Sequence, residues 1–229
     1  MNQLLSIGIL PVVLTLFAFQ IGLQCQKKCR LSLFNPILIA VLVVLLFLPV
    51  IGMERKTYQE GMKLLAWLMT PATVSLAIPM YEQFQILKKN LKGILAGVTA
   101  GTVSCLTMLL IGMLLLRFDR SLAVSLLPKG ITTAIGMPLA ELYGGIPSVA
   151  TMGIIFTGIF GNVLGLQFCK WSGITEEIAR GVAFGTGAHV IGTAKAGEIS
   201  PLCGAVSSLS LVVAGLMTAL LFPVLTSFL

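Results

Sequence analysis

The sequence predicts an all-α integral membrane protein with six to eight transmembrane spans. Of its 229 residues, 57% are hydrophobic and only 10% are charged, and the mean hydropathy is +1.02. A soluble domain carries roughly 25% charged residues because its surface must be hydrated. We expect one transmembrane domain over 1–229, in which 118–229 holds two interrupted or re-entrant segments that meet near the membrane midplane and carry the candidate site.

The N-terminal part, 1–117, contains four apolar runs, at 4–24, 35–53, 64–81 and 91–116. About twenty helical residues at 1.5 Å each cross a hydrocarbon core of roughly 30 Å. The third run contains Thr70-Pro71 and Pro79, so we expect it to be broken or kinked. The segment 54–63 before it is predicted to be a loop.

Two basic clusters predict the orientation of the chain. The first contains Lys27, Lys28 and Arg30, and the second lies at 88–92. Cytoplasmic loops are enriched in lysine and arginine, so both clusters are expected inside, with the N-terminus and 54–63 outside. The net charge of +7 then reflects topology and contact with lipid head groups, and no nucleic acid is expected as a partner.

The second half is interrupted more often. Breakers occur at Pro128-Lys129-Gly130, Gly144-Gly145 and Gly185-Thr186-Gly187, which leaves 147–169 and 201–228 as uninterrupted spans. If 121–143 and 175–197 cross completely as broken helices, the chain has eight spans. If they are re-entrant hairpins that enter from opposite faces, it has six. Both alternatives place the C-terminus outside.

Internal similarity supports paired breaks. Residues 71–80 and 128–137 align without gaps at a shift of 57 residues, and 186–193 resembles them more loosely. The shared pattern is a helix breaker followed by hydroxyl-bearing residues. Corresponding interrupted segments point to a transporter binding site, whereas the alternative is that the breakers only shape packing. The expected structural breaks are Pro71, Pro128, Gly130, Gly185 and Gly187.

The first candidate site is Lys129 with Thr132 and Thr133. A charge at the bilayer centre costs about 2.5–3.5 kcal/mol on insertion scales, and a bound anion would offset this cost. The two hydroxyls fall in the first turn after the break, where hydroxyls and free N–H groups can converge on a carboxylate or a phosphate. Helix capping and snorkelling of Lys129 to the interface are the structural alternatives.

The second candidate site surrounds His189, the single histidine. An ionisable group in a membrane segment is a functional candidate, and histidine can accept a proton in the physiological range. Proton coupling and a neutral hydrogen bond to substrate or to a carbonyl remain alternatives. Thr186 and Thr193 flank His189 and complete the predicted substrate-binding set.

Catalytic chemistry is not indicated. The sequence has no nucleophile and base pair, no phosphate-binding loop and no cluster of metal ligands, and its five cysteines suggest neither a disulfide framework nor a zinc site. We therefore expect no enzyme activity, no catalytic residues, no cofactor and no metal. Gly161 and Gly165 form a small-residue face for a neighbouring helix.

These motifs give the chain a resemblance to the LrgB/CidB family, which includes the C-terminal part of the plastid glycolate/glycerate translocator. The resemblance covers essentially the whole chain. It rests on motifs that are distributed along the sequence: Asn35-Pro36, 71–83, Leu127-Pro128-Lys129 with Thr132-Thr133, Gly145-Ile146-Pro147 and 180–198. The sequence departs from the usual family pattern at Gly130 and Ala188, which replace serines beside the candidate site.

The resemblance implies a multi-pass protein of the bacterial cytoplasmic (inner) membrane. It implies a carrier of small monocarboxylates such as pyruvate, glycolate or glycerate. It also implies an alternative, a holin- or antiholin-like protein that modulates murein hydrolase activity and autolysis. The partners expected from it are a small organic anion, membrane lipid, an LrgA/CidA-like small membrane protein and further copies of the chain.

Overall fold

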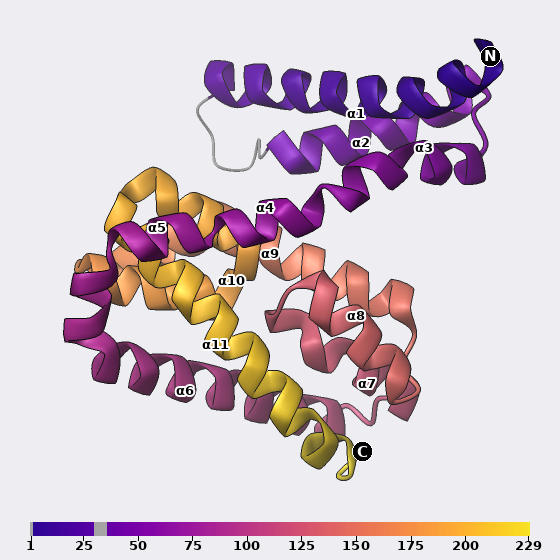
Figure 1. Cartoon of the computed structure of the whole chain (residues 1–229). Coiled ribbons are helices and arrows are strands. Elements are labelled where there is room, and N and C mark those ends of the chain that lie inside the picture. The colour runs from indigo at the N-terminus through magenta and orange to yellow at the C-terminus, as the bar shows by residue number, and fades with distance from the viewer. Residues whose placement is uncertain (1, 30–35) are drawn as a thin grey trace. The chain divides into compact units, whose positions relative to one another are not determined.

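The computed structural model describes residues 2–29 and 36–229, and these residues form helices without any strand. The predicted all-α class is therefore confirmed. The chain separates into two compact units, Met1–Ser75 and Leu76–Leu229, whose helices are labelled in Figure 1. This boundary lies earlier in the chain than the division at 117–118 that the apolar pattern suggests.

The first unit contains α1 (Asn2–Cys29), α2 (Pro36–Ile51), α3 (Arg55–Trp67) and α4 (Met69–Ser75). Helices α1 and α2 pack closely because Gly22 has no side chain: a Cβ there would lie 2.8 Å from the Cα of Pro36. The hydroxyls of Thr15 and Tyr58, 2.8 Å apart, join α1 to α3. Arg30 of the first basic cluster and Asn35 at the start of the second apolar run lie outside the described residues.

The expected loop at 54–63 is wrong, because α3 begins at Arg55. No proline occurs between Arg55 and Trp67, and residues such as Gln59, Met62 and Leu64 favour helix. Charge alone made this segment resemble a loop. The predicted run at 64–81 is broken as expected, since it is divided among α3, α4 and α5 (Ala77–Glu82).

The second unit contains the remaining helices. After α5 come α6 (Phe84–Leu115), α7 (Arg120–Leu126), the 3-10 helix η1 (Leu127–Gly130), α8 (Thr133–Leu142), α9 (Pro147–Trp171), α10 (Glu177–Ile199) and α11 (Pro201–Thr226). Among the described residues, α1, α6, α9 and α11 contain stretches long and apolar enough to cross a membrane, and α2 is a shorter apolar helix. The predicted total of six to eight spans stays a prediction.

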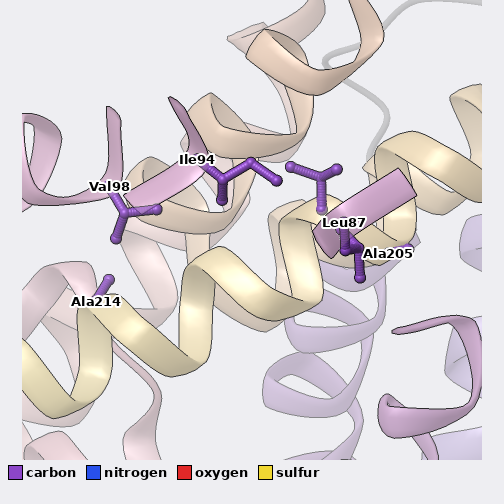
Figure 2. Packing of buried hydrophobic residues seen from close by; sticks show 6 residues of the cluster. Leu87, Ile94, Val98, Ala205 and Ala214 are labelled. Carbon is purple, nitrogen blue, oxygen red and sulfur yellow. The ribbon is translucent and has the colours of Figure 1, made fainter. Parts of the chain in front are cut away.

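One buried cluster of the second unit lies between α6 and α11. Figure 2 shows Leu87, Ile94 and Val98 of α6 beside Ala205 and Ala214 of α11, all of them buried. Small alanines on α11 let the larger side chains of α6 fill the space between the helices. These two long helices therefore form a scaffold for the interrupted segments.

Glycine faces bring α10 close to its neighbours. A Cβ on Gly97 or Gly101 of α6 would lie 3.2 Å from Val182 or 3.4 Å from the Thr186 hydroxyl of α10. On α9, Gly161 lies against the Cβ of Ala188. Small residues allow helix axes to approach in this way in membrane proteins, and the predicted small-residue face at Gly161 and Gly165 is confirmed, since both lie against α10.

Candidate functional site

The first interruption separates α7 and η1 from α8. Pro128 has non-helical angles (φ −82°, ψ 15°) and Ile131 is extended (φ −117°, ψ 179°). Proline removes an N–H donor and disfavours helical continuation, so the break lies where the sequence predicts it. Thr132 is the N-cap of α8, its side chain makes no capping hydrogen bond, and Thr133 is the first helical residue.

The segment 120–146 folds back on itself. The hydroxyl of Ser121, at the start of α7, donates to the carbonyl of Gly144, after the end of α8, at 3.2 Å. The buried hydroxyl of Ser125 accepts a hydrogen bond from the Ile146 N–H at 2.6 Å. Helices α7 and α8 thus lie side by side as a hairpin (Figure 1), with its two ends together and the interruption at its tip.

The second interruption lies within α10 at His189. Its backbone angles are φ 42° and ψ −136°, in the left-handed region that non-glycine residues rarely adopt. A Cβ on Gly192 would lie 2.7 Å from the carbonyl oxygen of Phe184, whereas residues eight apart in a straight helix are separated by about 12 Å. The chain therefore turns sharply at His189, and 177–199 is a second helical hairpin.

Buried hydrogen bonds hold this turn in place. His189 is 3% exposed, and its Nε2 lies 2.9 Å from the carbonyl oxygen of Ile154 in α9. A carbonyl oxygen can only accept, so Nε2 is the donor. Thr193 donates to the His189 carbonyl at 2.9 Å and pairs with the Ser207 hydroxyl of α11 at 2.8 Å, while Asn162 of α9 donates to the Ile191 carbonyl at 3.1 Å.

The two interruptions meet inside the second unit. A Cβ on Gly130 would lie 3.9 Å from the Thr186 carbonyl oxygen. Where η1 and α10 meet α6 and α11, they enclose a cavity of about 10 Å³. The residues that line it are small or apolar: Thr102, Cys105, Leu106, Leu127, Gly130, Ile131, Thr186, Ala214 and Thr218. We call this space the junction cavity.

A larger, open groove of about 680 Å³ lies along α9, between η1 and α10. Aromatic and aliphatic side chains form most of its wall, and Lys129, Thr157 and Gly187 also line it. Within the part of the chain that the structure describes, Lys129 forms no ion pair. The groove therefore offers one cationic group in mostly apolar surroundings, and we call it the Lys129 groove.

The structure divides the predicted binding residues among different environments. Lys129 lines the groove and Thr186 lines the junction cavity, with the Thr186 hydroxyl donating to the Val182 carbonyl at 2.7 Å. Thr132 and Thr133 follow the first break but are not among the described residues that line either space. His189 and Thr193 are engaged in the hydrogen bonds that fix the second turn.

The predicted breakers also differ in their roles. Pro128 and Gly130 lie at the first interruption, but Pro71 lies within α4, after an interruption at Leu68.

Gly185 and Gly187 lie in the helical half of α10 that precedes His189. Gly185 contacts the Ser207 backbone carbonyl of α11, whereas a Cβ on Gly187 would meet nothing within 4 Å.

Several groups at the site were not predicted. The Ile154 carbonyl and Ser207 hold the second turn, and Thr102 and Thr218 line the junction cavity. Single hydroxyl residues in long apolar helices are common, so their sequence positions carry no signal. A carbonyl partner such as that of Ile154 has no side-chain signature at all.

The long apolar helices indicate a helical membrane protein. Its candidate site lies where the interruptions of two helical hairpins adjoin. More particularly, the chain belongs to the LrgB-like family, whose model matches residues 15–228. This family assignment indicates a membrane protein of the holin-like or transporter type.

The chain is also similar to the Bacillus subtilis (strain 168) protein "Uncharacterized protein YwbG". The two are 34% identical over 224 residues, which cover 97% of this chain and 99% of the relative. No solved structure matches the chain. The comparisons therefore establish the family over nearly the full length of the chain.

Proposed function

We propose that this protein is a carrier for small monocarboxylates of the pyruvate, glycolate or glycerate class. The observation that carries this proposal is Lys129, an ammonium group without an ion pair in the described residues that lines an apolar groove beside the meeting point of two broken helices. A lone charge in such surroundings is costly, and intramembrane charges mark substrate pathways.

The chemistry of the groove suits a short organic acid. A carboxylate has only acceptor oxygens, and the ammonium of Lys129 has three N–H donors for them. The carbon chain of the substrate would lie against apolar walls such as Phe156 and Phe160. In this proposal Lys129 binds the carboxylate, while His189 and Thr193 hold the turn that forms the far side of the site.

We also propose that both hairpins are re-entrant, which gives six spans. Helix α8 has ten residues and extends about 15 Å, roughly half the thickness of a hydrocarbon core. The ends of 120–146 lie together through Ser121 and Gly144, so this segment would return to the face it entered from. Irregular backbone at membrane depth is tolerated where protein surrounds it.

Uptake into proteoliposomes tests the carrier function. We expect saturable uptake of labelled pyruvate, glycolate or glycerate by the wild type, at least tenfold slower uptake by Lys129→Ala, and partial recovery in Lys129→Arg. Lys170→Ala is the matched control, because Lys170 lies in the last turn of α9 and is not among the described residues of the groove. Uptake that is unaffected by Lys129→Ala would exclude this site.

The alternative is a holin- or antiholin-like protein of the cytoplasmic membrane that acts on autolysis. The family assignment supports the holin-like type. The same liposomes distinguish it from a carrier. A holin-like assembly would release trapped solutes regardless of their charge and would not saturate. An LrgA/CidA-like partner and homo-oligomers belong to either function, and co-purification from membranes tests them.

A further inference from the structure

Thr102 of α6 carries an unpaired hydroxyl in the junction cavity. The residue is 5% exposed, and its Oγ1 is buried without a hydrogen-bond partner among the described residues. Buried polar groups in native proteins are almost always satisfied, so an unpaired one calls for a ligand, an ion or a water. Because Thr102 lines the junction cavity, that cavity is the place where such a partner would lie.

The cavity offers further oxygen atoms. Thr218 of α11 is 2% exposed and lines the same space, so its hydroxyl is a second oxygen atom at the cavity. The carbonyl of Thr186 lies beside Gly130, in the last turn before the interruption at His189. Carbonyls in the last turn of a helix lack regular intrahelical partners, so this oxygen is available as a ligand.

Helix dipoles favour a cation here. Both segments that reach the cavity do so at their C-terminal ends, η1 at Gly130 and the first half of α10 just before His189. Helix C-termini carry partial negative charge. In membrane carriers, half-helix C-termini and unwound carbonyls are the groups that coordinate small cations, and hydroxyl and carbonyl oxygens are ligands for hard cations.

The side chain of Lys129 lies on a different side of η1 from the junction cavity. The Cβ of Lys129 is 3.7 Å from the position that a Cβ would take on Gly153 of α9. Gly130, in contrast, approaches Cys105 of α6 and Thr186 of α10. Lys129 therefore lines the groove, while Gly130 lines the junction cavity. A carboxylate bound to Lys129 would cancel the repulsion between the ammonium and a cation behind it.

We propose that the junction cavity binds a dehydrated Na⁺ ion through the hydroxyls of Thr102 and Thr218 and the carbonyl of Thr186. A space of about 10 Å³ holds a single water-sized group, which favours Na⁺ over the larger K⁺. Binding itself is independent of the carrier function. The role of Na⁺ as a coupling ion rests on the proposed function, because substrate at Lys129 and Na⁺ at the cavity then favour each other.

Two measurements on the purified full chain in detergent test the site. The first is the unfolding temperature in NaCl, KCl and choline chloride at equal ionic strength, since a ligand that binds the native state stabilises it. The second is equilibrium binding of ²²Na⁺. We expect the wild type to show a Na⁺-specific rise in unfolding temperature and saturable binding of about one ion per chain.

Variants locate the site. Thr102→Val and Thr218→Val are expected to lose the Na⁺-specific shift and the ²²Na⁺ binding. In choline chloride, Thr102→Val should unfold at the wild-type temperature or above it, because the unpaired hydroxyl is gone, and this shows that the variant folds. Thr151→Val is the matched control and should keep both responses, since Thr151 bonds to the Pro147 carbonyl and is not among the described cavity residues.

The outcomes separate this proposal from the carrier function. Identical unfolding temperatures in the three salts with no ²²Na⁺ binding would overturn the cation site and leave water as the occupant. Na⁺ responses that survive in both threonine variants would also overturn it. Saturable ²²Na⁺ binding without monocarboxylate uptake would support the cation site and count against the carrier, and Lys129-dependent uptake without Na⁺ binding would do the reverse.

Discussion

The Nε2 atom of His189 donates a hydrogen bond to the carbonyl oxygen of Ile154 at 2.9 Å, and this bond attaches the second interruption to α9. Gly158 leaves room for the ring, because a Cβ there would lie 2.5 Å from the Cε1 atom of His189. The imidazole thus has a protein partner within the buried site. This arrangement favours the neutral hydrogen-bonding role over proton coupling, which stays a hypothesis.

Two substitutions of His189 are expected to distinguish the contribution of the imidazole ring to stability from the cost of the positive φ. His189→Ala removes the hydrogen bond and leaves a cavity, and we expect it to lower the free energy of unfolding by about 2–4 kcal/mol. His189→Gly makes the same deletion but accepts the positive φ of 42°, so it should be roughly 1 kcal/mol less destabilised. Denaturant unfolding in detergent measures both, and equal losses would contradict backbone strain at this residue.

A double substitution is expected to reveal the coupling between Thr193 and Ser207. Thr193→Val leaves the fully buried Ser207 hydroxyl without its partner at 2.8 Å and should cost about 1–3 kcal/mol. Because the partner is already lost, adding Ser207→Ala should cost less than it does alone, with a coupling of about 0.5–1.5 kcal/mol. Additive effects in the unfolding free energy would show that the pair is not formed.

Two neighbouring glycines are expected to respond in opposite directions. Gly185→Ala would place a methyl group against the Ser207 carbonyl and 2.7 Å from the Cβ of Ser210. The α11 backbone would have to shift to accommodate it, which costs free energy. We expect a loss of about 1–3 kcal/mol or more. Gly187→Ala meets nothing within 4 Å and should gain up to about 1 kcal/mol from helix propensity. Unfolding temperatures test the pair, and similar losses in both would exclude the packing of α10 on α11 seen here.

The sequence was sufficient for features that have a local cause. Apolar length gave the long helices, and Pro128 gave the first interruption because proline itself prevents helical continuation. The glycine face at 161–165 was also predictable, since close helix packing requires small residues. The helix at 55–67 was not predicted, because its mixed charges are typical of a loop, although residues such as Gln59 and Met62 favour helix.

The second interruption could not be located from local sequence. Gly185 and Gly187 were the expected breakers, but the turn occurs at His189, and non-glycine residues adopt positive φ only rarely. Tertiary hydrogen bonds stabilise that turn, one between His189 and the Ile154 carbonyl and one between Thr193 and Ser207. Likewise, the unpaired hydroxyl of Thr102 becomes informative only once α10 and α11 enclose it.

The fold-back of both interrupted segments predicts a specific labelling pattern in the membrane. We consider a cysteine-free variant with single cysteines at positions that the structure exposes, treated with a membrane-impermeant maleimide in oriented vesicles. Arg120→Cys and Glu141→Cys lie near the two ends of the first hairpin, so both should react from outside. Ser172→Cys and Glu198→Cys lie near the two ends of the second hairpin and should both react from the cytoplasmic side.

Sidedness has an internal reference in the basic cluster at 88–92, where Lys88→Cys should react only from the cytoplasmic side. Reaction of Arg120→Cys and Glu141→Cys from opposite faces would mean that 120–146 crosses completely. That result would conflict with the Ser121–Gly144 and Ser125–Ile146 hydrogen bonds, because a crossing would separate these ends by about 30 Å of hydrocarbon. If the two hairpins enter from opposite faces and meet at their tips, the two cysteines of each pair should react from the same face. The pair in the first hairpin and the pair in the second should then react from opposite faces.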